Sequence, residues 1–203
     1  MINQGGETLP IYSKTMKIET IEIAGFAGAL TALRLPFGKE VRSRIETDNY
    51  WNDGMDRPTA IWHNETDIEL DPYDEILMQT LVKRGDEHAK VVRGINVWAK
   101  ITAPVYWWAE EETYRAGHER LASESTMHID CRGLSGKELQ EAKAAIPMGK
   151  ELTKVDMFSY QTLRRIVAQR HNHRLPEWHT FIDWVRTLPF AEELILVGLE
   201  TEK

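Results

Sequence analysis

The stretch of sequence from residue 71 to residue 104 reads DPYDEILMQTLVKRGDEHAKVVRGINVWAKITAP and predicts a helix followed by a strand. Asp71 places a capping side chain directly before Pro72, a residue type that is favoured at the first position of a helix. Gly85 is typical of a helix end. Alternation of apolar and polar side chains over residues 95–102 indicates a half-buried strand. The apolar stripe expected on the helix consists of Ile76, Leu77, Thr80 and Leu81.

The segments on either side predict further helices and one more strand. Weak alternation favours an edge strand over residues 17–23, which Gly25 closes. The remaining expectations are a poorly ordered lead-in over residues 1–15, a long loop with some strand over 38–69, a loop over 118–135, and helices over 26–35, 104–115, 137–146, 151–170 and 176–185. This order of elements indicates an α/β fold in which residues 1–203 form a single domain.

The composition is that of a globular domain. Of the 203 residues, 42% are hydrophobic and 28% are charged, and the formal net charge is -7. Such an acidic chain lacks the broad basic surface that duplex DNA requires, and no apolar run approaches the length of a membrane span. Cys131 is the single cysteine, so no internal disulfide can form and an oxidising compartment is not implied. We therefore expect a cytoplasmic protein that binds neither duplex nucleic acid nor a membrane.

Arg170 is the most informative candidate for a functional residue. It follows Leu163, Ile166 and Val167 at helical spacing and therefore shares the face that these residues bury. A guanidinium in such a place needs a partner, because an unpaired buried charge is very costly. That partner is either a carboxylate of the same chain or a bound anion. The cationic side chains around it, which favour an anion, are Arg164, Arg165, His171, His173 and Arg174.

Two other segments carry side chains that could line a site. The hydroxyl-rich segment over residues 123–128 could surround phosphate oxygens with side chains and backbone amides. Glu110, Glu111 and Glu112 are consecutive in a predicted helix, so at most one or two of them can face a pocket. Histidines are numerous, but their spacing matches no common metal motif, and we expect no metal site. The chain also lacks the glycine-rich motifs of Rossmann and P-loop nucleotide sites.

These segments, in this order, resemble the flavin-dependent thymidylate synthases over about residues 71 to 185. Asp74-Glu75-x-Leu77-x-x-x-Leu81-x-x-x-Gly85-x-Glu87, with the strand that ends at Ala103-Pro104, is similar to the helix, Gly-His-Glu turn and strand of that family. Arg115 matches the family's opening Arg-His-Arg, in which Thr113 and Tyr114 occupy the other places. Residues 123–128 are similar to its Asn-Glu-x-Ser-x-Arg, and Arg170 with Trp178 to its late helix. Asp86 stands in place of a histidine and Glu110 in place of a glutamine.

The resemblance implies a central mixed sheet with flanking helices, a homotetramer and FAD as cofactor. It further implies transfer of a one-carbon unit from methylene-tetrahydrofolate to C5 of a pyrimidine deoxynucleoside monophosphate, dUMP or dCMP, with NADPH as reductant. Arg170 would be the catalytic residue. The residues that would bind the nucleotide are Glu110, Glu124, Ser125, Thr126, His128, Arg170 and Arg174. Those that would bind the cofactor are His88, Thr113, Tyr114, Arg115 and Arg165.

Two other functions remain open at this point. One is a catalytically inactive nucleotide-binding protein on the same fold. The other is a metal-dependent hydrolase that uses the histidines.

Overall fold

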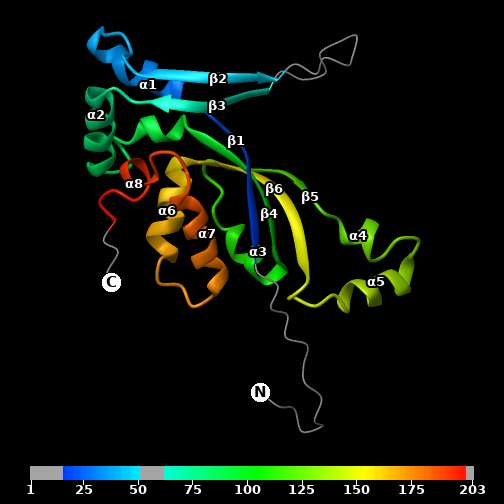
Figure 1. Cartoon of the computed structure of the whole chain (residues 1–203). Coiled ribbons are helices and arrows are strands. Elements are labelled where there is room, and N and C mark those ends of the chain that lie inside the picture. Colours follow the sequence, from blue (N-terminus) through cyan, green and yellow to red (C-terminus); the bar gives the residue numbers. More distant parts are fainter. Residues whose placement is uncertain (1–15, 51–61, 200–203) are drawn as a thin grey trace, which may run out of the picture.

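A four-stranded sheet organises the protein, in a computed structural model that describes residues 16–50 and 62–199 (Figure 1). Its strands lie in the order β1 (Lys17–Ala24), β4 (Asn96–Pro104), β6 (Glu151–Ser159) and β5 (His118–Ser123). Each neighbouring pair is antiparallel. The expected α/β fold with a central sheet and flanking helices is confirmed, and the described sheet is antiparallel where a mixed sheet was expected. The predicted lead-in over residues 1–15 lies outside the described residues.

The helices pack around this sheet and around a second, two-stranded one. That second sheet pairs β2 (Arg44–Tyr50) with β3 (Trp62–Glu69), and it lies beside the first helices at one end of the molecule (Figure 1). The α-helices are α1 (Phe26–Arg34), α2 (Pro72–Lys83), α3 (Val105–Glu111), α4 (Thr126–Ile129), α5 (Gly136–Ala144), α6 (Tyr160–Arg170), α7 (Pro176–Arg186) and α8 (Ala191–Leu194). Two short 3-10 helices are η1 (Leu35–Phe37) and η2 (Lys90–Arg93).

The start and end of α2 follow the sequence signals, but its buried face does not. The side chain of Asp71 accepts a hydrogen bond from the backbone N–H of Tyr73, as expected for a cap. The residues of α2 that are buried are Asp74, Met78 and Val82, whereas Ile76 of the predicted stripe is 62% exposed. The helix is rotated relative to the prediction because Asp74 has buried polar partners, which the apolar pattern does not reveal.

Two predictions about the second half of the chain are wrong. Residues 151–170 form strand β6 and then helix α6, not one long helix. Residues 118–123 form strand β5 at the sheet edge, where a loop was predicted. The hydroxyl of Ser159 accepts from the N–H of Thr162, so the helix is capped at the residue where the strand ends. No loop separates β6 from α6.

Aromatic side chains from α3 and α7 fill the core against one face of the sheet. Trp107 contacts Trp178 with ring centroids 4.9 Å apart, and both are fully buried. Phe158 of β6 packs edge-on against Phe181 of α7 at 5.8 Å. Such aromatic pairs contribute beyond the area they bury. They fix α3 and α7 relative to β6, which positions the polar groups at the ends of these helices.

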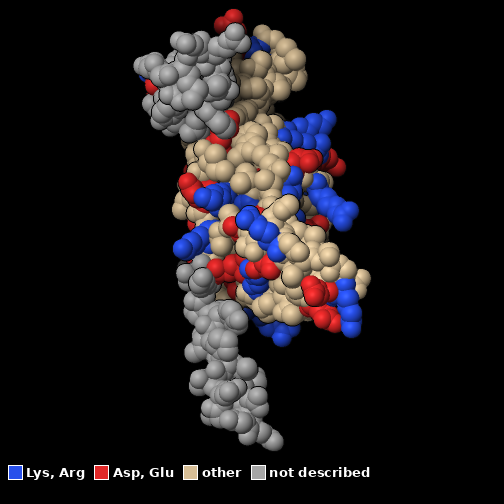
Figure 2. Space-filling model, turned by 90° about the vertical axis from the view of Figure 1, so that its right-hand side faces the viewer, with Lys and Arg blue, Asp and Glu red and all other residues tan. Residues whose placement is uncertain are grey.

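Charged side chains of both signs are interleaved on the face shown in Figure 2. That face therefore offers no continuous basic surface of the kind that tracks a duplex. Among the described helices, none combines the length and the apolar character needed to cross a bilayer.

Candidate functional site

The last turn of α6 carries Arg170 to a position between α3 and α7. Its Nη1 donates a hydrogen bond to Oε2 of Glu110 at 3.0 Å, and its Nε donates to the hydroxyl of Tyr114 at 2.8 Å. The guanidinium also lies over the ring of Trp178, 4.8 Å from the centroid. The side chain of Arg170 is 19% exposed. Its partner within the chain is thus a carboxylate, which was one of the two alternatives left open by the sequence.

Glu110 is the acceptor at the centre of this group. Its Oε2 also accepts from the indole N–H of Trp178 at 3.0 Å and lies 3.3 Å from Nε2 of His173. Trp178 is fully buried, whereas the side chain of Glu110 is 34% exposed, so the group lies where the core meets the surface. We refer to Glu110, Tyr114, Arg170, His173 and Trp178 as the Arg170 cluster. It offers a cation, an anion and aromatic rings at a partly open position, which suits a planar polar ligand.

The turn after α3 contains three of the residues expected to bind the cofactor. Tyr114 is buried and belongs to the Arg170 cluster. The hydroxyl of Thr113 donates to the backbone carbonyl of Glu110 at 2.8 Å. The side chain of Arg115 is exposed. The structure therefore brings Tyr114 into the Arg170 cluster and leaves the guanidinium of Arg115 at the surface.

Three other residues expected to bind the cofactor or the nucleotide lie on α6, in the connection after it, and near α2. Arg165 forms an ion pair with Asp86 at 2.8 Å, which ties α6 to the turn after α2. Arg174 is exposed in the connection between α6 and α7. His88 lies at an apolar cavity of about 470 Å³. The small and apolar residues that wall this cavity include Gly28, Ala29, Ala32, Val91 and Gly94.

The segment expected to hold phosphate, residues 123–128, spans the end of β5 and the start of α4. Glu124 accepts a hydrogen bond from a backbone N–H of β6 at 2.7 Å, and Thr126 accepts one from a lysine of α5. Ser125 precedes α4 without a side-chain capping bond, and His128 is exposed. Among the described residues, no hydrogen bond or ion pair joins this segment to the Arg170 cluster. Figure 1 likewise places α4 away from the connection between α6 and α7.

A second polar group, which the sequence did not reveal, lies at the end of α3. Arg120 of β5 donates to Oε2 of Glu111 at 2.6 Å and to the two oxygens of Asp156 at 3.0 and 3.1 Å. Nε2 of His118 lies 3.2 Å from Oε1 of Glu111 and 3.3 Å from Oδ2 of Asp156. Both carboxylate side chains are fully buried. We refer to Glu111, His118, Arg120 and Asp156 as the buried ion network.

Burial and mutual charge set the protonation of this network. Burial raises the pKa of Glu111 to about 7, although His118 and Arg120 act against it. Burial also acts to raise the pKa of Asp156, but hydrogen bonds from His118 and Arg120 outweigh it, and the pKa is lowered. Burial favours the neutral ring of His118, yet Asp156 and Glu111 together raise its pKa. Glu111 therefore exchanges its proton near neutral pH, well above the usual range of a carboxyl group.

Three members of the network also have the spacing of metal ligands. One ligand atom each of Glu111, His118 and Asp156 lies within 4.8 Å of the others. The guanidinium of Arg120 already contacts both carboxylates and supplies the positive charge that an ion would bring. We therefore interpret the group as an internal ion network. The other histidines considered in the sequence, which lie outside it, are His128, His171, His173 and His179.

The comparisons with known proteins concern the fold. No family model matches the sequence, and no curated protein matches it. Among solved structures, the chain is similar to flavin-dependent thymidylate synthase ThyX from Helicobacter pylori complexed with FAD and dUMP. The TM-score is 0.61 at 11% identity, over 89% of this chain and 99% of that one. A second structure of the Helicobacter pylori protein with FAD and dUMP gives a TM-score of 0.62 at 10% identity, over 92% of this chain and 100% of that one.

The chain has the fold of the flavin-dependent thymidylate synthases. A further protein with this likeness is the UMP/dUMP methylase PolB from Streptomyces cacaoi bound with 5-Br dUMP. Its TM-score is 0.55 at 10% identity, over 90% of this chain and 95% of that one. The thymidylate synthase fold thus spans nearly the whole chain, including residues before 71 that the sequence motifs did not reach.

Proposed function

We propose that the chain is a divergent enzyme of the flavin-dependent thymidylate synthase type. It transfers a one-carbon unit from methylene-tetrahydrofolate to C5 of a pyrimidine deoxynucleoside monophosphate, dUMP or dCMP, with FAD as cofactor and NADPH as reductant. The observation that carries the proposal is the Arg170 cluster, a partly open group of cation, anion and aromatic rings on a fold whose solved examples include proteins with FAD and dUMP.

Arg170 and Glu110 are the residues that we assign to the pyrimidine ring. A guanidinium donates to ring carbonyl oxygens and stabilises the negative charge that develops when C5 acts as a nucleophile. The indole of Trp178 and the hydroxyl of Tyr114 hold these two side chains in place, which limits reorganisation when the ring binds. Arg174 is exposed in the connection that follows α6, and we assign it to the nucleotide as well.

FAD fits the chemistry of the expected donors and of the apolar cavity. The cavity beside His88 has walls of glycine and alanine on α1, which leave room for a flat ring, and Lys90 adds a cation to its lining. Besides His88, the residues assigned to hold the cofactor are Thr113, Tyr114, Arg115 and Arg165. When bound, FAD supplies the redox step, in which reducing equivalents from NADPH reach the one-carbon unit. The residues of the chain itself bind and orient the nucleotide and the cofactor, and they exclude water from the site.

A homotetramer is part of the proposal. Ser125, with Glu124, Thr126 and His128, is not joined to the Arg170 cluster within one chain. Sites shared between subunits would bring the two groups together. Mixing Arg170→Ala and Ser125→Ala proteins should then restore binding through hybrid sites, whereas a monomer in light scattering at micromolar concentration would contradict the assembly.

The second candidate is a nucleotide-binding protein on the same fold without flavin or catalysis. It is favoured by Arg165 and Tyr114, two expected cofactor residues whose polar groups are already paired within the chain. The enzyme predicts a yellow protein, and the binding protein predicts a colourless one that still binds a nucleoside monophosphate.

A flavin titration of the full-length chain separates the two. Visible absorbance of the purified protein comes first, followed by FAD fluorescence during titration. Arg115→Gln should weaken FAD binding, and Arg132→Gln, which removes an exposed arginine elsewhere, is the matched control. Tritium release from C5-labelled dUMP and dCMP then measures turnover. If FAD fluorescence did not change at concentrations far above cellular levels, the proposed enzyme would be contradicted. If dUMP nevertheless raised the melting temperature of that protein, the nucleotide-binding function would be supported.

A further inference from the structure

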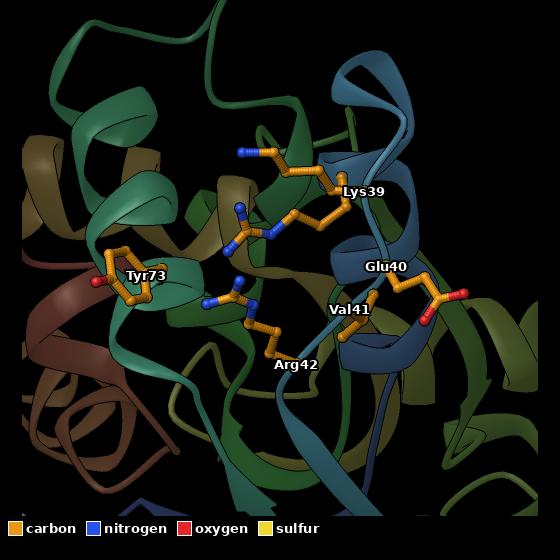
Figure 3. Close-up of a pocket in the computed structure, with 6 residues that line it drawn as sticks. Lys39, Glu40, Val41, Arg42 and Tyr73 are labelled. Carbon is orange, nitrogen blue, oxygen red and sulfur yellow. The ribbon is translucent and has the colours of Figure 1, made fainter.

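A cleft between α1 and the start of α2 gathers three basic side chains that the proposed function does not use. Its volume is about 590 Å³, and it is lined by Arg34, Lys39, Glu40, Val41, Arg42 and Tyr73. Figure 3 shows the charged ends of Lys39 and Arg42 reaching toward the side on which Tyr73 lies, while the carboxylate of Glu40 points away from both. The cleft therefore presents positive charge without a lining carboxylate that turns into it.

Arg34 is the buried member of these three cations. It lies in the last turn of α1, and its side chain is 10% exposed. Its Nε donates to Oδ1 of Asp74, whereas its Nη2 is buried and has no hydrogen-bond partner among the described residues. A buried N–H without an acceptor is costly, and most such groups in proteins are satisfied. An oxyanion in the cleft would supply the missing acceptor.

Asp74 accepts four hydrogen bonds and holds the site in place. Its Oδ2 accepts from the hydroxyl of Ser43 at 2.6 Å, from the N–H of Ser43 at 3.1 Å and from the N–H of Arg42 at 3.3 Å. Burial works against its charge, but these bonds and that of Arg34 lower its pKa, so it stays ionised. Gly38, with φ of 60°, turns the chain so that the following residues return past the end of α1. One buried carboxylate therefore holds the side chain of Arg34 and the backbone of Arg42.

Tyr73 adds an aromatic surface beside these charges. Its side chain is exposed, and the guanidinium of Arg42 lies 5.4 Å from the ring centroid. A flat ring can stack on an exposed tyrosine, and phosphate oxygens are the preferred partners of arginine forks. We propose that this cleft binds the diphosphate group of a nucleotide, with the three cations on the phosphate oxygens and the base against Tyr73.

This site is separate from the Arg170 cluster within one chain. Figure 1 places α1 and α2 at one end of the molecule and the connection between α6 and α7 at the other. The inference therefore rests on its own observations and does not require the proposed reaction.

Calorimetric titration of the full chain with inorganic pyrophosphate and with ADP tests the site. Lys39→Gln and Arg42→Gln change exposed side chains, and each should weaken pyrophosphate binding at least about tenfold, because each removes a charge-assisted hydrogen bond. Lys137→Gln, an exposed lysine on α5, is the matched control and should bind like the parent chain. Tyr73→Leu should weaken the binding of ADP more than that of pyrophosphate. Thermal melting of every variant checks that it is folded.

Several outcomes would overturn the proposal. These are no pyrophosphate binding by the parent chain, unchanged affinity in both Lys39→Gln and Arg42→Gln, or an equal loss in Lys137→Gln. A loss in Arg170→Gln without a loss in Lys39→Gln would assign the anion to the Arg170 cluster instead. If Tyr73→Leu weakened the binding of ADP and of pyrophosphate equally, the base would not lie against Tyr73. Pyrophosphate binding at the cleft with no binding of FAD or dUMP would contradict the proposed function and leave this site intact.

Discussion

Arg170 and Glu110 join the end of α6 to α3 through one hydrogen bond of 3.0 Å, and both side chains remain partly exposed. The same pair can serve two purposes. It can hold two helices together, or it can present a preorganised cation and anion to a ligand. The two purposes predict different results when either residue is changed.

Arg170→Lys should lose most of the nucleotide response while the protein remains folded. A lysine keeps the charge but not the planar fork, so it cannot contact Glu110, Tyr114 and a ligand together. Loss of a charge-assisted bond should lower dUMP affinity by about one to two powers of ten. The measurement is melting temperature with and without saturating dUMP. Arg186→Lys, an exposed residue of α7, is the control. A variant that melts lower yet keeps its full dUMP-induced shift would make Arg170 a purely structural residue.

Glu110→Gln tests which base is recognised. An ionised carboxylate only accepts hydrogen bonds, so Glu110 suits the exocyclic amine of cytosine, whereas an amide both donates and accepts. We expect dCMP to compete well with dUMP in the parent chain, and Glu110→Gln to move the preference toward dUMP. Competition measured by melting shift gives the ratio, and Glu119→Gln controls for loss of an exposed carboxylate. A clear preference for dUMP that is the same in the parent chain and in Glu110→Gln would show that Glu110 does not contact the base.

Stability should decrease with rising pH because of Glu111. Its pKa in the folded protein is about 7, above the ordinary 4.5, so the folded state binds more protons than the unfolded state between these values. The stabilisation is complete below about pH 4.5 and is lost as the pH rises to about 7. The raised pKa of His118 acts in the same direction, with loss beginning above its ordinary 6.5.

Glu111→Gln isolates this contribution. Because glutamine does not titrate, the melting temperature of the variant relative to the parent should be more favourable at about pH 8 than at about pH 5.5. Glu119→Gln on β5 reports the general effect of removing a carboxylate. If the melting temperature of Glu111→Gln relative to the parent were the same at both pH values, the raised pKa of Glu111 would be contradicted.

Gly25→Ala should destabilise the fold far more than Gly85→Ala. Both glycines have similar φ values, 107° and 104°, so both substitutions carry the backbone strain of about 1–2 kcal/mol. Only at Gly25 would a Cβ meet another atom closely, the carbonyl oxygen of Gly94 at 1.9 Å, whereas at Gly85 nothing lies within 4 Å. Urea denaturation of the two variants measures the difference. Equal losses would mean that the start of α1 moves easily away from Gly94, the residue that ends η2.

Sequence patterns predicted the elements whose buried face is apolar. Helix α7 and strand β4 follow their periodicity, since Val97, Ala99 and Ile101 are fully buried while the residues between them are not. The sequence pattern of β6 favours a helix over a strand because its buried side chains include Lys154 and Asp156, whereas Val155 between them is less buried. Charged residues on the inner face invert the alternation that identifies a strand.

The candidate site could be predicted from the sequence only in part. Arg170 was found because a cation lay on an otherwise apolar helical face, and its contact with Glu110 joins two residues that the sequence had already singled out. The buried ion network was missed because its members come from α3, β5 and β6, and their pairing depends on sheet register. His118 and Arg120 lie two residues apart, as do Lys154 and Asp156, and this period of two was the available signal.

Three consecutive glutamates at the C-terminal end of α3, the last of them the C-cap residue Glu112, limit how this helix can change in evolution. Glu110 belongs to the Arg170 cluster, Glu111 to the buried ion network, and Glu112 contacts Arg120 from outside. Inserting or deleting one residue before them would rotate all three by about 100° around the helix axis. Two of the three carboxylates would then face the partners of a neighbouring glutamate. Homologues should therefore tolerate substitutions in α3 but keep its length, and insertions should be found in the connections on either side of it.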